Sequence, residues 1–162
     1  MIVIADTTPL ITLLKINHFN VLKSLFGTIH IPIGVYEELT ENPNFSEESK
    51  IIKNCDFLEV HNDISFDRVD LLRRATGLDK GESEAIILAD SLKEKTLIID
   101  EAHGRSVAEQ MGIPITGVIG VLIAAYKKGY LSSDEIKKCV EIMKNSNRFI
   151  SNSLYELLLS VI

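Results

Sequence analysis

The chain alternates short, continuous apolar runs with longer stretches in which apolar residues recur at helical spacing. A run of four or five apolar residues is typical of a strand buried on both faces of a parallel sheet. Apolar residues at every third or fourth position instead predict helices that bury one face. The predicted strands are 2–5, 28–31, 57–61, 96–99 and 113–115; the predicted helices are 9–16, 18–26, 32–39, 46–54, 66–75, 81–92, 103–111, 118–128, 133–144 and 153–160.

This order of strands and helices predicts an α/β fold, a three-layer α/β/α sandwich with a central parallel sheet. No repeat or linker divides the sequence, so residues 1–162 are expected to form a single domain. The helix at 81–92 is apolar nearly all round, which places it in the centre of the protein. Ligands gather at the carboxyl ends of such strands, and Asp6 and Asp100 each close one.

Composition excludes several classes of protein. The hydrophobic share is 46% and the charged share 25%, as in an ordinary globular domain. The apolar stretch 113–126 is too short to span a membrane, and the first residues lack a secretory leader, so a cytoplasmic protein without membrane contact is expected. Cys55 and Cys139 lie far apart and suggest two free thiols rather than a zinc site.

Local capping explains some of the polar residues near the expected site. Thr8 before Pro9 is a suitable N-cap, which leaves Asp6 as a carboxylate beside a buried run, where charge is costly unless it is paired or bound to metal. Asp79 and Glu82 have the spacing of a capping box. That motif does not explain Glu84, which lies in an otherwise apolar helix and would be desolvated there.

Two further acids have competing interpretations. Glu38 lies on the helix after the second strand, where a glutamate is commonly part of a solvated face. Asp100 suits a helix N-cap and a site residue equally well. Taken together, acids at two strand ends and on two helices form an all-oxygen set that suits Mg²⁺ or Mn²⁺. Such ions promote the hydrolysis of phosphodiesters.

Four segments in order resemble the PIN-domain family and cover about two thirds of the chain. They are Val3-Ile4-Ala5-Asp6-Thr7-Thr8-Pro9-Leu10; Ile31-Pro32 with Val35 to Leu39; Leu78-Asp79-Lys80-Gly81-Glu82-Ser83-Glu84-Ala85; and Leu97-Ile98-Ile99-Asp100-Glu101 with Gly104-Arg105. The resemblance implies a metal-dependent ribonuclease, often the toxin of a VapBC-like toxin–antitoxin pair. RNA, an antitoxin protein and a second copy of the chain in a homodimer are the partners it implies.

The resemblance also suggests roles for individual residues. Asp6, Glu38, Glu84 and Asp100 match the acidic positions of the family, with Asp6, Glu84 and Asp100 as the implied metal ligands, and Thr7 or Thr8 matches a supporting hydroxyl. The third acid is commonly Asp in the family. Here it is Glu84, and Glu82 is near enough to take the role instead.

Other interpretations stay open at this stage. The net charge of −6 argues against general electrostatic attraction to RNA, so bound cations or local basic residues must reverse the field. Arg105 is one candidate for contact with an RNA phosphate, although a surface pair with Glu101 also suits it. Phosphoryl transfer through Asp6 lacks a second Asp two residues on, where Thr8 stands. A PIN-like scaffold with a weakened acidic site would bind nucleic acid or a partner protein without catalysis.

Overall fold

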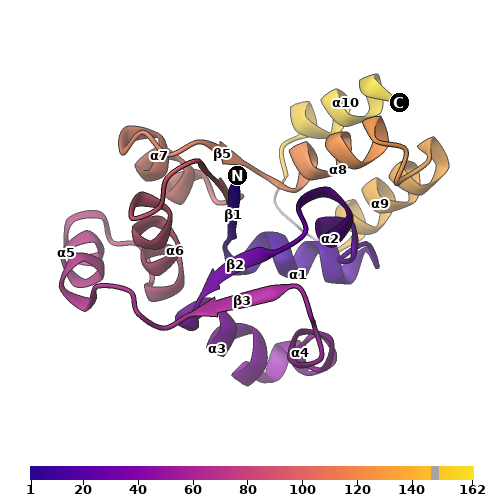
Figure 1. The fold of residues 1–162 in the computed structure, drawn as a ribbon. Helices are drawn as coiled ribbons and strands as arrows, with labels where there is room; N and C mark the ends of the chain where they lie inside the picture. Colours follow the sequence, from indigo (N-terminus) through magenta and orange to yellow (C-terminus); the bar gives the residue numbers. More distant parts are fainter. Residues whose placement is uncertain (147–149) are drawn as a thin grey trace.

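The computed structural model describes residues 1–146 and 150–162, and within them it has the predicted α/β architecture (Figure 1). The strands are β1 (Ile2–Ala5), β2 (Ile29–Pro32), β3 (Leu58–His61), β4 (Lys95–Ile98) and β5 (Ile115–Thr116). The helices are α1 (Thr7–Lys15), α2 (Val21–Phe26), α3 (Ile33–Glu41), α4 (Ser46–Lys53), α5 (Phe66–Thr76), α6 (Lys80–Asp90), α7 (Ala102–Gln110), α8 (Val118–Lys127), α9 (Ser133–Asn145) and α10 (Asn152–Val161), with a 3-10 turn at Pro43–Phe45.

The five strands form one parallel sheet in the order β3-β2-β1-β4-β5. Chain order runs outward from β1 to β3 on one side and from β4 to β5 on the other. The direction of winding therefore reverses between β1 and β4, which pair from Ile2 with Lys95 to Ala5 with Ile98. Ligands bind at the carboxyl ends of strands that flank such a reversal. In this protein those positions are the segments that follow β1 and β4.

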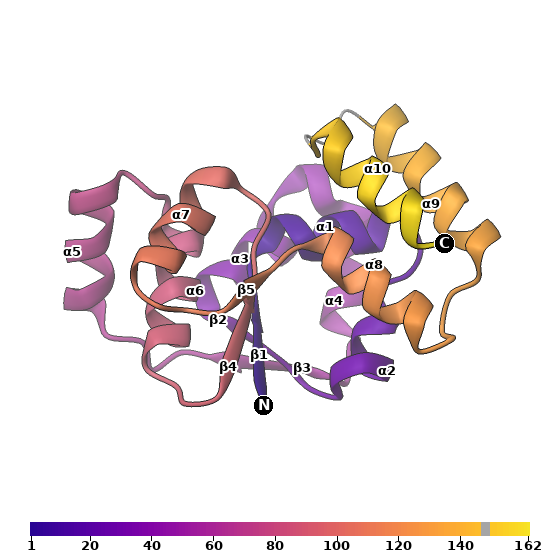
Figure 2. The same cartoon turned by 90° about the horizontal axis from the view of Figure 1, so that it is seen from above.

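Helices cover both faces of the sheet, as Figures 1 and 2 show. Successive strand residues point to opposite faces, so each central strand contributes to two cores. Val3 and Ala5 pack in the core formed with α1, α2, α3 and α8 to α10. Ile4 packs on the opposite face with α6 and α7. The predicted three-layer sandwich is confirmed.

Three element boundaries differ from the prediction for reasons in the backbone. Helix α1 begins at Thr7 with Asp6 at the N-cap position, because a proline at the third helical position, Pro9, still lies among the residues whose N–H groups have no partner. Pro32 ends β2 in an extended conformation instead of opening the helix. The predicted helix 18–26 begins later, at Val21, because the chain first turns after α1, with a positive φ of 61° at Asn17.

Two simpler expectations concern membrane spans and cysteines. None of the helices within residues 1–146 and 150–162 is long and apolar enough to cross a bilayer. Cys55 and Cys139 are both free thiols, and Cys139 is buried. Burial raises the pKa of the Cys139 thiol to about 11, so this side chain stays protonated and packs as a small apolar group.

Candidate functional site

Asp6 lies at the carboxyl end of β1, immediately before α1, and its side chain is 4% exposed. Its N–H donates to the Ile98 carbonyl at 3.0 Å, which ties it to the neighbouring strand β4. Burial raises the pKa of its carboxyl from an ordinary 3.8 to about 7, although the Thr7 N–H acts against this rise. The charged neighbours that raise this pKa further are Asp79, Glu38 and Glu101. Asp6 is therefore surrounded by like charge.

Glu38 approaches this strand end from α3. The Thr7 hydroxyl donates to Glu38 Oε2 at 2.9 Å and so orients the carboxylate. The start of α6 comes close on the other side, because a Cβ at Gly81 would lie only 3.3 Å from the same Oε2 atom. Of the two threonines considered from the sequence, Thr7 is buried and contacts Glu38, whereas Thr8 is exposed.

Asp79 and Glu82 begin α6, but they form only half of the predicted capping box. Asp79 Oδ1 accepts a hydrogen bond from the Glu82 N–H at 2.8 Å. The Glu82 side chain does not return to the Asp79 backbone and instead lies against the carboxyl groups of Asp79 and Glu101. The side chain of Glu82 is 7% exposed, and a Cβ at Gly104 would lie 3.1 Å from its Oε2. The close approach of Gly104 leaves room for the Glu82 side chain beside Asp79 and Glu101.

The buried Oε2 of Glu82 has no hydrogen-bond donor among the described residues. The partners of the Glu82 side chain are the carboxyl groups of Glu101 and Asp79, which donate a hydrogen bond only if one of the acids is protonated. Burial, then contact with Glu101 and Asp79, raise the pKa of Glu82 well above its usual range. A buried carboxylate without a donor is costly, and a cation is the usual remedy. We call Asp6, Glu38, Asp79, Glu82 and Glu101 the acidic group.

Glu84 is also buried, at 5% exposure, but it points elsewhere. A backbone hydrogen bond from the Gly34 N–H reaches its carboxylate, and a Cβ at Gly34 would overlap its Oε2. This Oε2, like that of Glu82, has no hydrogen-bond partner among the described residues. Burial raises its pKa, and the charged residues that act on it are Lys80, Glu37 and Arg73 rather than members of the acidic group. Glu84 is thus placed in a separate environment between α6 and α3, and Glu82 lies with Asp79 and Glu101.

Asp100 follows β4, yet it contacts the start of α8 instead of capping α7. Its Oδ1 accepts from the Val118 N–H at 3.1 Å, and a Cβ at Gly117 would overlap this oxygen. The residue at the N-cap position of α7 is Glu101. Burial raises the pKa of Asp100, while the Val118 N–H and the Arg105 charge lower it. Asp100 therefore links β4 to α8.

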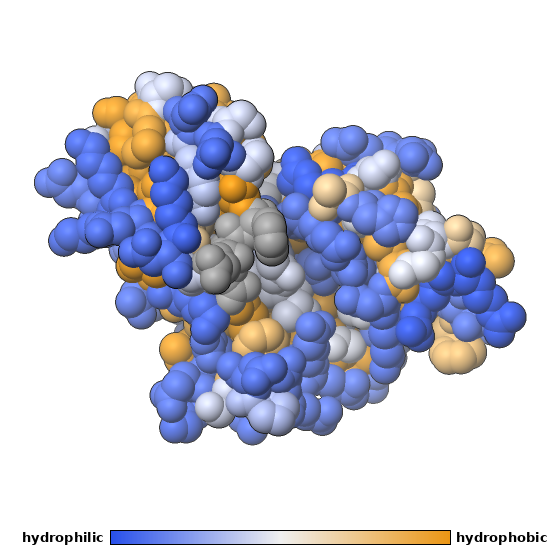
Figure 3. Space-filling model, turned by 180° about the vertical axis from the view of Figure 1, so that it is seen from behind, coloured by the Kyte–Doolittle hydropathy of each residue, from blue (hydrophilic) through white to orange (hydrophobic). Residues whose placement is uncertain are grey.

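Arg105 packs at the same corner and donates from Nη1 to the Ile99 carbonyl at 2.8 Å. No ion pair between Arg105 and Glu101 is formed among the described residues, so the surface pair considered from the sequence is absent there. Both side chains line a groove of about 780 Å³ between α7, β5, α8 and α10. Figure 3 shows the surface notched between the α5–α7 lobe and the C-terminal helices. The acid Glu101 thus borders a recess with a guanidinium beside it.

The donor chemistry of the acidic group fits a hard divalent cation such as Mg²⁺ or Mn²⁺, because every side chain offers carboxylate oxygens. The raised pKa values of Asp6 and Glu82 and the unpartnered Oε2 fit the same cation. The group is nevertheless wider than a closed ligand set. Among the described residues, ligand atoms of three side chains come within 4.8 Å of one another only at His30, Glu59 and His61, on β2 and β3.

Sequence reasoning did not select Glu101 or Asp79 for the site. Asp100 and Glu101 are adjacent after β4, and adjacent residues of an extended segment point to opposite sides, so only one of them can face Asp6. The adjacent acids Asp100 and Glu101 were therefore the signal in the sequence that either residue could belong to the site. Asp79 was explained by capping, a role it does have through the Glu82 N–H, although it also acts on Asp6.

Comparison with known families supports the fold assignment. A family model described as a PIN domain matches residues 2–162. Comparison with curated proteins and with solved structures gave no match. The matched region includes every strand of the sheet and all five acids at its carboxyl edge. On this match the chain belongs to the PIN-domain family.

Proposed function

We propose that the chain is a divalent-metal-dependent endoribonuclease that hydrolyses RNA phosphodiester bonds at the acidic group. PIN domains are generally nucleases, which supports the reaction class. The observation that carries the proposal is Glu82, whose buried side chain lies against the carboxyl groups of Glu101 and Asp79 and whose Oε2 has no donor among the described residues. Such an arrangement is costly by itself and becomes favourable when a cation is shared.

Within this proposal the acids have distinct tasks. Asp6, Glu82 and Glu101 would hold Mg²⁺ or Mn²⁺, and Asp79 fixes the start of α6 while adding negative charge. A bound divalent ion would supply an activated water and neutralise charge on the phosphate. Glu38, oriented by the Thr7 hydroxyl, is available to accept a proton or to complete the ligand set. We place Glu84 and Asp100 outside this set, because the N–H groups of Gly34 and Val118 act on their carboxylates instead.

RNA binding requires a local reversal of the acidic field, since the net charge is −6. Ions at the acidic group would provide most of this reversal. The groove that Glu101 and Arg105 line shares Glu101 with the acidic group, and we assign it as the path of the RNA strand. Arg105 would then contact a phosphate next to the cleaved bond.

We propose the toxin of a toxin–antitoxin pair, active in the cytoplasm as a homodimer, as the biological role. This part rests on the resemblance of the sequence motifs to the family. The test is whether the product of a neighbouring small reading frame binds this chain and blocks cleavage. A neighbouring protein that neither binds nor inhibits would contradict the toxin role and leave the nuclease proposal intact.

The nuclease proposal is tested by cleavage of a mixed RNA pool with Mn²⁺, with EDTA, and with Asp6→Asn in Mn²⁺. We expect cleavage by the wild type in Mn²⁺ alone. Cleavage that persists in EDTA or in Asp6→Asn would contradict the mechanism. A wild type that neither cleaves RNA nor binds Mn²⁺ would favour the scaffold that binds a partner without catalysis.

A further inference from the structure

Three potential metal ligands lie together on the two outermost strands of one side of the sheet. His30 is on β2, and Glu59 and His61 are on β3. His30 is registered with Glu59, and residues two apart on a strand share a face, so all three side chains project from the same face. It is the face of Ile4, which is registered with His30 and packs with α6. We call these residues the histidine group.

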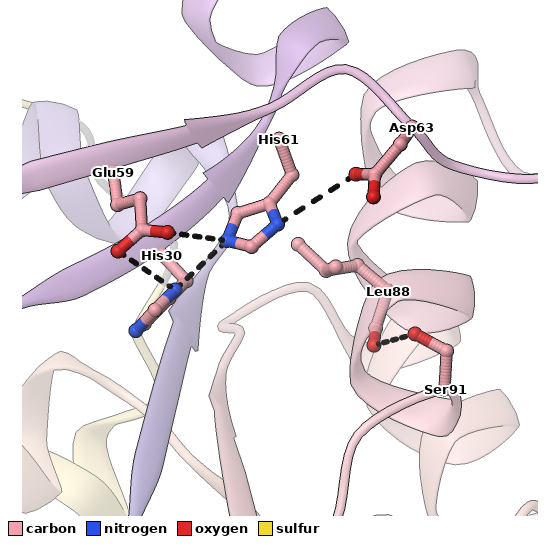
Figure 4. Close-up of polar contacts among 6 residues, drawn as sticks. All are labelled: His30, Glu59, His61, Asp63, Leu88 and Ser91. Atoms are coloured by element: carbon pink, nitrogen blue, oxygen red, sulfur yellow. Dashed lines mark hydrogen bonds and ion pairs between the residues drawn. The ribbon is translucent and has the colours of Figure 1, made fainter.

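The ligand atoms of the histidine group converge on one point (Figure 4). His30 Nδ1 and His61 Nε2 are 2.8 Å apart. Glu59 places Oε2 3.8 Å from His30 Nδ1 and Oε1 3.8 Å from His61 Nε2. Ligand atoms in a tetrahedral zinc site are separated by about 3.3 Å, given metal–ligand bonds of about 2.0 to 2.1 Å. The nitrogen–nitrogen distance is shorter than this value and the two nitrogen–oxygen distances are longer. Small side-chain rotations would therefore bring all three to the spacing of a tetrahedral site.

The surroundings prepare both imidazoles to act as ligands. Asp63 Oδ1 lies 3.9 Å from His61 Nδ1, on the side of the ring away from His30. A carboxylate in this position favours a proton on Nδ1 and leaves the Nε2 lone pair free for a metal. Burial and the nearby His61 lower the pKa of His30, although Glu59 acts in the opposite direction.

A hydrogen bond between the two rings would account for their close contact, but it would not account for the position of the Glu59 carboxylate. The side chain of Glu59 is 58% exposed and could extend into solvent, yet its two oxygens face the two ring nitrogens. The histidine side chains are 17% and 19% exposed, and Leu88 of α6 lies beside His61. The group is thus sheltered on one side and open to solvent on the other.

The geometry points to a second metal site at His30, Glu59 and His61, which takes a late first-row divalent ion of the Zn²⁺ class. Two imidazole nitrogens and one carboxylate suit Zn²⁺, Co²⁺ or Ni²⁺ and do not suit Mg²⁺, which prefers oxygen ligands. Three protein ligands leave one position for water or an external group. The site is separate from the acidic group in elements and donor chemistry and does not depend on the proposed nuclease activity.

The test is a Zn²⁺ titration of EDTA-treated, dialysed protein against a chromophoric competing chelator. We expect one Zn²⁺ per chain at the histidine group, with affinity reduced by about tenfold or more in His30→Gln and in His61→Gln. His18→Gln is the matched control, since it removes an imidazole from outside the group. Glu82→Gln should keep the Zn²⁺ affinity of the wild type. Co²⁺ should give the visible spectrum of a tetrahedral site in the wild type but not in His61→Gln.

Thermal unfolding in EDTA shows whether each histidine variant folds. If one does not, Glu59→Gln replaces it, because this side chain is largely exposed and its loss should weaken Zn²⁺ binding without unfolding the protein. The site would be overturned by a wild type that binds no Zn²⁺ in competition with the chelator. Wild-type affinity in folded variants of the histidine group, or loss of affinity in Glu82→Gln, would overturn it as well.

Discussion

The acidic group and the histidine group belong to the same parallel sheet but differ in position, burial and donor atoms. The acidic group lies at the carboxyl ends of the central strands β1 and β4, and it gathers like charges with raised pKa values. The histidine group lies on β2 and the edge strand β3, and it combines two imidazole rings with one carboxylate. The histidine group is the tighter cluster, because one ring nitrogen can donate a hydrogen bond to the other, whereas carboxylates repel. Compactness alone therefore does not decide which of the two groups is the site of the proposed hydrolysis.

The largest expected effect is the loss of cleavage in a variant of the acidic group, which should bind Zn²⁺ as the wild type does. Asp6→Asn should lower Mn²⁺-dependent cleavage by about a thousandfold, since metal-ion stabilisation is worth several kcal/mol, and should leave Zn²⁺ affinity unchanged. His61→Gln should lower Zn²⁺ affinity and leave Mn²⁺-dependent cleavage unchanged. The measurements are initial cleavage rates in Mn²⁺ and Zn²⁺ titrations of both variants. Loss of both properties in either variant would show that the two groups act as one site.

Stability should depend on pH through Asp6 when divalent metal is removed. Its pKa is raised from 3.8 to about 7 in the folded protein, so the folded state binds the proton more tightly than the unfolded chain. Stability due to this group should therefore fall as pH rises from about 4 to about 7, by at most about 4 kcal/mol.

Urea unfolding in EDTA at pH 5 and pH 8 measures this change, with Asp6→Asn as the reference that lacks the titrating group. The free energy of unfolding of the wild type should drop more than that of the variant. Mn²⁺ should restore more stability at pH 8 than at pH 5, because it binds the ionised acids. An equal pH dependence in wild type and variant would contradict the burial of an ionisable Asp6.

Gly104→Ala tests whether space beside Glu82 is needed. The new methyl group would lie 3.1 Å from Glu82 Oε2 and 2.7 Å from Ile99 Cδ1, so we expect a loss of about 1 to 3 kcal/mol in stability and weaker Mn²⁺ binding. Gly34→Ala is the control, because its methyl group would collide with Glu84 instead. Calorimetric Mn²⁺ titrations should distinguish them. Equal Mn²⁺ affinity in both folded variants would argue against a role for Glu82.

The smallest effect concerns the hydroxyl that orients Glu38. Thr7→Val removes the 2.9 Å hydrogen bond and should cost about 1 kcal/mol, seen as a five- to tenfold lower kcat/KM in Mn²⁺. Thr8→Val changes an exposed residue of the same type and should leave cleavage unchanged. A decrease in Thr8→Val with none in Thr7→Val would reverse the assignment of the supporting threonine.

The sequence was sufficient to predict the parallel sandwich and the position of Asp6 at the end of a buried strand, because an apolar run that ends in a carboxylate is typical of such a strand end. It was not sufficient to choose between Glu82 and Glu84. These positions are about 200° apart around a helix, so they cannot face the same point, but periodicity cannot say which one faces Asp6 when both sides are buried. That choice depends on Gly34 and Gly104, whose missing side chains make room for the two carboxylates.

The histidine group, and the choice of Glu101 over Asp100, were beyond prediction for a related reason. His30 and His61 are distant in sequence and meet only through the register of β2 with β3, which no local pattern specifies. Glu101 follows Asp100 directly, and both suited a strand-end acid. The contact of Asp100 with the Val118 N–H depends on where α8 begins, after the chain has passed through α7 and β5.

The most direct test compares Glu82→Gln with Glu84→Gln for Mn²⁺-dependent RNA cleavage. Both residues are buried on α6, two positions apart, and each substitution removes one charge while keeping nearly the same volume. We predict that Glu82→Gln abolishes cleavage and Mn²⁺ binding, whereas Glu84→Gln folds and retains both. Full activity in folded Glu82→Gln, or loss of activity in Glu84→Gln alone, would contradict the assignment of the acidic group as the site of hydrolysis.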